Sequence, residues 1–122
     1  MSKKDILYKF QKTVKEHTLE GSDDMFKMTA LVGELGELAN VMKKEGYTES
    51  DEMIEYKERV EQEIASGKRK TWKEQKIDEA GDTFFYFIQL LNDWDIPIEK
   101  IMRYQMEKLK SQDKQWKRTF KK

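Results

Sequence analysis

Two pairs of acidic residues stand inside apolar helical sequence, where charged side chains are unusual. Glu34 and Glu37 lie within the apolar segment 30–41, and Glu79 and Asp82 directly precede the aromatic segment 84–87. Each pair has a spacing of three residues, which puts both carboxylates on one side of an α-helix. Removing a carboxylate from water is costly unless a cation compensates its charge. The pattern ExxE followed by ExxD therefore predicts four carboxylates that converge on a cation.

The neighbours of the acids indicate which kind of cation this is. Gln75, Glu79, Asp82 and Tyr86 fall within about 60° of arc on a helical wheel, so the second acidic pair shares its face with a phenol. A site made only of carboxylate oxygens suits a hard cation, above all Mg²⁺ and also Mn²⁺, and Mg²⁺ typically binds substrate phosphates as well. The alternative is that the acids form salt bridges to the plentiful lysines. His17 is the only histidine, which excludes a ferritin-like di-iron site.

Composition excludes several other classes of function. A chain of 122 residues with one proline predicts a single domain, 1–122. The 24 basic and 24 acidic residues balance, so no nucleic-acid-binding surface is expected. The absence of cysteine excludes thiolate metal sites and cysteine nucleophiles. The longest apolar run, 84–88, is too short to span a bilayer, and we expect a cytoplasmic protein that does not contact membranes.

Hydrophobic periodicity predicts helices throughout and no strand. Ser22 is the expected N-cap of the helix that carries the first acidic pair, and Gly46 is expected to end that helix in the left-handed conformation. Thr71 and Glu74 form a capping box at the start of the helix that carries the second pair. The expected helices cover about 3–16, 23–45, 49–65, 72–93 and 98–109. The predicted fold is an all-α bundle of four main helices plus one inserted polar helix, the third.

The fourth helix is apolar on more than one face. Phe84, Phe87 and Leu91 lie on one face and Phe85 and Ile88 on another, which exceeds what one small core can cover. We therefore expect an oligomer, a homodimer or a homotetramer.

The acidic motifs and their surroundings resemble a known family. Segment 30–39, the segment Glu79–Asp82, Tyr86 and the helix that follows are similar to the MazG-like all-α nucleoside triphosphate pyrophosphohydrolases, over roughly residues 25 to 110. The resemblance implies Mg²⁺-dependent hydrolysis of a (deoxy)nucleoside triphosphate to the monophosphate and pyrophosphate. It implies that Glu34, Glu37, Glu79 and Asp82 are the metal ligands and catalytic residues. Relatives act on dCTP, dUTP, phosphoribosyl-ATP or damaged nucleotides, so the base is left open.

The chain departs from the family pattern in three respects, one of which is Asn40, which stands where many relatives carry a further acid. The 41 residues between Glu37 and Glu79 form a longer spacer than is usual, and the polar helix 49–65 accounts for the excess. On the last helix, Gln105 and Leu109 occupy positions where relatives often place a lysine and an asparagine for the phosphates. Candidate substrate-binding residues are therefore Asn40, Lys44, Lys73, Tyr86 and Lys108. The alternative function is a non-catalytic helical module that dimerises or binds a partner, with its acids in ion pairs.

Overall fold

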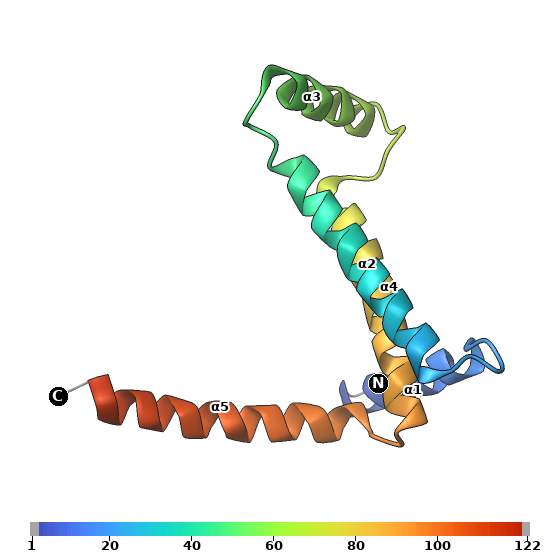
Figure 1. Cartoon of the computed structure of the whole chain (residues 1–122), viewed down its shortest axis with the longest axis vertical. Coiled ribbons are helices and arrows are strands. Elements are labelled where there is room, and N and C mark those ends of the chain that lie inside the picture. Colours follow the sequence, from blue (N-terminus) through green and yellow to red (C-terminus); the bar gives the residue numbers. More distant parts are fainter. Residues whose placement is uncertain (1–2, 121–122) are drawn as a thin grey trace. The chain divides into compact units, whose positions relative to one another are not determined.

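The chain is helical throughout the part that the structure describes. The structure, a computed structural model, describes the backbone of residues 3–120 and the side chains of residues 5–112, and within these residues it contains five α-helices and no strand (Figure 1). The helices are α1 (Lys3–Glu16), α2 (Asp24–Glu45), α3 (Asp51–Ala65), α4 (Trp72–Asp93) and α5 (Ile98–Phe120). The predicted all-α class is confirmed, and α5 continues past the predicted end near residue 109. No described helix is long and apolar enough to cross a bilayer.

Backbone contacts divide the chain into two compact units. The first contains α1, the end of α4 from Ile88 onward, and α5; the second contains residues 22–87, with α2, α3 and the first part of α4. The candidate acidic residues all belong to the second unit. The prediction of one domain over 1–122 stays a prediction.

In the first unit, side-chain hydrogen bonds connect α1 to the turn between α4 and α5. The Gln11 side chain donates a hydrogen bond to the carbonyl of Ile96 (2.8 Å) and accepts one from the N–H of Ile98 (3.1 Å). Asp95, with φ of 56°, ends α4 in the left-handed conformation, and the N–H of Ile96 donates to the carbonyl of Leu91 (2.9 Å), as in a Schellman motif.

The buried side chains of the first unit include two residues from the apolar faces of α4. Ile88 is 4% exposed and Leu91 is 2% exposed, and Val14 and Leu90 are buried with them. These residues belong to a core within the chain itself. Phe84 is 59% exposed, so the exposed apolar surface of α4 lies earlier on the helix.

In the second unit, α2 and the first part of α4 run antiparallel beside each other (Figure 1). The helices α2 and α3 both end where predicted, but their starts and the conformation of Gly46 differ from the predicted ones. Asp23, and not Ser22, caps α2, because its side chain accepts a hydrogen bond from the N–H of Phe26 (2.8 Å). Gly46 has φ of −90° and is not left-handed. The helix α3 begins after Ser50, whose hydroxyl accepts from the N–H of Met53 (3.2 Å).

The predicted capping box of α4 is confirmed. The N–H of Glu74 donates to the Thr71 hydroxyl (3.1 Å), and the N–H of Thr71 donates to the Glu74 carboxylate (3.2 Å). These hydrogen bonds to Thr71 lower the pKa of Glu74 below its usual 4.5. The capping box fixes where α4 starts and therefore the register of Glu79 and Asp82.

We expect this capping box to make stability depend on pH. A carboxylate with a lowered pKa in the folded state stabilises the fold above its unfolded pKa, and this contribution is lost as pH falls through the folded pKa. Glu74→Gln should therefore lower the melting temperature at neutral pH and have little effect in acid below the lowered pKa. Thermal unfolding of both proteins across the acid range tests this. A melting-temperature difference that stays constant with pH would contradict it.

Candidate metal centre

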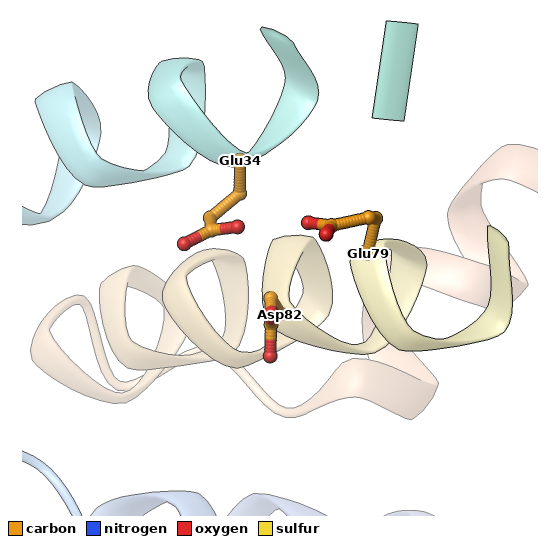
Figure 2. A group of neighbouring side chains, drawn as sticks. All are labelled: Glu34, Glu79 and Asp82. Carbon is orange, nitrogen blue, oxygen red and sulfur yellow. The ribbon is translucent and has the colours of Figure 1, made fainter. Parts of the chain in front are cut away.

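Three of the four predicted acidic residues come together between α2 and α4. Glu34 projects from α2, and Glu79 and Asp82 project from successive turns of α4 (Figure 2). Each of the three offers a carboxylate oxygen, and these oxygens all lie within 4.8 Å of one another. Glu34 and Glu79 are half-buried, whereas Asp82 is exposed. The cluster is therefore open to solvent on the side of Asp82.

The helical spacing places the fourth acid on this open side. Glu37 and Asp82 each follow the first acid of their motif by three residues, which is a rotation of about −60° on each helix. This rotation has the same sense on both helices when each is viewed from its N-terminus. Because α2 and α4 are antiparallel and Glu34 faces Glu79, the rotation brings Glu37 and Asp82 to the same side of the helix pair. Glu37 lies outside the group of three and is exposed.

The carboxylates of the cluster repel one another. Burial raises the pKa of Glu79 above its usual 4.5, and the negative charges of Glu34, Asp82, Glu37 and Asp78 raise it further. All the charged groups that shift this pKa are acids within the described part of the chain. A raised pKa means that the stabilising contribution of Glu79 is present below its unfolded pKa and is lost as pH rises through the folded pKa. A bound cation would remove this repulsion.

Four basic residues of the second unit pair with acids outside the cluster, which argues against the salt-bridge interpretation of the cluster. Lys70 pairs with Asp78 at 3.1 Å and Arg69 with Glu63 at 2.7 Å. Further pairs join Lys57 to Glu61 and Lys76 to Glu45. Within residues 5–112, whose side chains the structure describes, no ion pair includes Glu34, Glu37, Glu79 or Asp82.

The donor set of the cluster meets the requirements of a hard divalent cation. Mg²⁺ binds oxygen ligands, keeps several waters and often uses only one or two carboxylates from the protein together with substrate phosphates. Three carboxylate oxygens in reach of one position, open to solvent on one side, provide such a partial ligand shell. Glu34, Glu79 and Asp82 are the residues that would hold the ion.

The five predicted substrate-binding residues occupy different surroundings. Asn40 and Lys44 follow Glu37 on α2, and Tyr86 follows Asp82 by one turn of α4; all three are half-buried. Lys73 lies about 180° from Asp82 around α4, on the side opposite the open face of the cluster. Lys108 is exposed on α5, in the other compact unit. The second unit thus places Asn40, Lys44 and Tyr86 near the acids along the same helices.

No protein-family model, curated protein or solved structure matches the chain.

Proposed function

We propose that the chain is a Mg²⁺-dependent nucleotide pyrophosphohydrolase, which hydrolyses a (deoxy)nucleoside triphosphate to the monophosphate and pyrophosphate. The observation that carries this proposal is the cluster of Glu34, Glu79 and Asp82, whose oxygens lie within 4.8 Å of one another without a basic partner in the described part of the chain. The resemblance of the ExxE and ExxD motifs to the MazG-like enzymes supports the same reaction.

The four acids have distinct roles in this proposal. Divalent ions held by Glu34, Glu79 and Asp82 would supply an activated water and neutralise phosphate charge. Glu37 stands beside the group, on its open side, where its carboxylate can accept a hydrogen bond from the attacking water. Hydrolysis by water agrees with a chain that has no cysteine. The expected cleavage lies between the α and β phosphates.

The proposal predicts products that the alternative function does not. With Mg²⁺ and a panel of canonical and damaged nucleotides, resolved by chromatography, we expect at least one triphosphate to give its monophosphate and pyrophosphate. Without divalent ions, this turnover should stop, because the carboxylates alone cannot activate water. A non-catalytic helical module would leave every nucleotide of the panel intact.

We also propose that the protein assembles through an apolar surface on the side of α2 and α4 opposite the open side of the acids. On α2, apolar residues recur in steps of four and three, as in a coiled-coil seam. On α4, Ile77 and Phe84 are one heptad apart. Val32, Ile77 and Phe84 are 60%, 62% and 59% exposed. The apolar stripes consist of Met28, Val32, Leu35, Ala39 and Met42 on α2, and Ile77, Phe84 and Phe87 on α4.

The two stripes favour a second copy of this chain as the partner that covers them. On each helix, the stripe is rotated in the same sense away from the acid that faces the other helix. Because the two helices are antiparallel, the two stripes therefore lie on the same side of the helix pair. All eight side chains of the two stripes are exposed, and their apolar surface can form the core of an interface between two copies. Two such helix pairs related by a twofold axis would complete a four-helix bundle.

A further inference from the structure

Two positively charged side chains meet at one tyrosine ring where α3 approaches the end of α2. The Lys44 Nζ lies 5.9 Å from the centre of the Tyr56 ring, and the Arg59 Cζ lies at the same distance, 5.9 Å. Tyr47, in the turn after α2, packs against Tyr56 with its ring centre 6.0 Å away and its plane tilted by 59°. The Tyr56 ring therefore contacts one cation from α2 and one from α3.

Both cations are without an acidic partner. Within the described side chains, neither Lys44 nor Arg59 forms an ion pair. By contrast, Lys57, on the same helix as Arg59, pairs with Glu61. Both cations are thus available to pair with a bound anion.

The cation pair lies on the same side of α2 as the open face of the acids. Lys44 follows Glu37 by seven residues, which is nearly two full turns, so both residues point to the same side of the helix. Seven residues correspond to about 10.5 Å along the helix axis. An anion bound at the acids through a divalent cation would have to extend along α2 toward its C-terminal end to contact Lys44.

We propose that Lys44 and Arg59 bind the terminal phosphates of the triphosphate substrate, with Tyr56 as the positioning residue for both. This inference rests on the proposed function and deepens it. It gives the inserted helix α3 a role, because α3 supplies Arg59 and Tyr56.

A purely structural role would have different consequences. If the ring contacts only fasten α3 to α2, removing either charge would change thermal stability but would affect all nucleotides alike. Binding of the terminal phosphates requires that the loss of affinity depend on the number of phosphates. Comparing a triphosphate with its monophosphate separates the two roles.

The experiment measures binding by isothermal titration calorimetry in the presence of Mg²⁺. The ligands are an α,β-methylene nucleoside triphosphate, which is not hydrolysed, and the monophosphate of the same nucleoside. The variants are Arg59→Gln and Lys44→Gln, and Lys57→Gln is the matched control, since it removes one charge from α3 outside the cation pair. For each of the two variants, we expect the Kd of the triphosphate to rise on the order of tenfold, as for a lost charged hydrogen bond. In these two variants, the Kd of the monophosphate should change little. In the Lys57→Gln control, the Kd of both ligands should change little.

Two results would overturn the inference while leaving the proposed function intact. One is a triphosphate Kd in Arg59→Gln and Lys44→Gln equal to that of Lys57→Gln. The other is an equal loss for triphosphate and monophosphate, which would assign the cations to another part of the nucleotide or to structure alone. If the wild-type protein binds no triphosphate in the presence of Mg²⁺, the proposed function and this inference both fail.

Discussion

Replacing Asp82 by asparagine is expected to abolish Mg²⁺-dependent turnover while leaving the metal-free protein as stable as the wild type or more stable. Asparagine keeps the shape of the side chain and removes one of the charges that raise the pKa of Glu79. Two carboxylates about 5 Å apart repel by about 1 kcal/mol in water and about 3 kcal/mol at the effective dielectric of a partly buried site. Because Asp82 is exposed, the repulsion that Asp82→Asn removes should be closer to the value in water, about 1 kcal/mol.

The loss of function should be much larger than the gain in stability. Residues that only support metal ligands already change metal affinity or activity by about 10- to 100-fold when mutated. Loss of a direct ligand should therefore reduce turnover by more than about 100-fold. The stabilisation of the fold by Mg²⁺ should decrease with it, since this stabilisation depends on the affinity for the folded state.

Asp78→Asn is the matched control for this experiment. It makes the same chemical change on the same helix, but Asp78 pairs with Lys70 and lies outside the group of three. Melting curves of wild type and both variants, with and without Mg²⁺, together with turnover rates, give the comparison. An Asp82→Asn protein that melts several degrees lower without metal and still hydrolyses nucleotides would show that the acids are a structural ion-pair network.

Placing a charge in the apolar stripes is expected to convert a dimer into a monomer. Val32→Lys and Phe84→Lys each put a lysine on the proposed interface, and the twofold symmetry of a homodimer places each change there twice. Burying an unpaired ammonium group costs several kcal/mol, which is enough to dissociate an interface of standard size. The mass from light scattering should fall from about twice 14.7 kDa to 14.7 kDa.

The control for this prediction is Tyr8→Lys, which replaces another exposed aromatic residue (71% exposed) outside the stripes. It should leave the mass at that of the wild type. A wild-type protein that is already monomeric at micromolar concentration would contradict the proposed assembly. Equal masses for all four proteins, each a dimer, would place the interface elsewhere.

The sequence predicted the helices well because their signals are local. The capping box of Thr71 and Glu74 involves neighbours in sequence, and it set the start of α4 correctly. Where two residues could each serve as a cap, the sequence did not decide: Ser22 and Asp23 both suit the start of α2, and the structure uses Asp23. Gly46 permits a left-handed end but does not require one, and it has φ of −90°.

Which residues meet across helices was harder to predict. Equal spacing in ExxE and ExxD suggested four equivalent acids, yet Glu37 lies outside the group within 4.8 Å, to which Asp82, its counterpart on α4, belongs. The position of Lys73 on the far side of α4 follows from a helical wheel and was available in the sequence. The contact of Lys44 with Tyr56 could not be predicted from the sequence, since it depends on how α3 packs against α2.

Hydrolysis in ¹⁸O-labelled water, with Mg²⁺ and the best triphosphate of the panel, tests the central claim most directly. Attack by a water held at the acidic cluster on the α-phosphorus predicts that the label appears in the nucleoside monophosphate and that unlabelled pyrophosphate is released. Mass spectrometry of both products shows where the label goes. Nucleoside diphosphate and labelled orthophosphate as the products, or no turnover of any nucleotide, would contradict the assignment of this chain as a pyrophosphohydrolase.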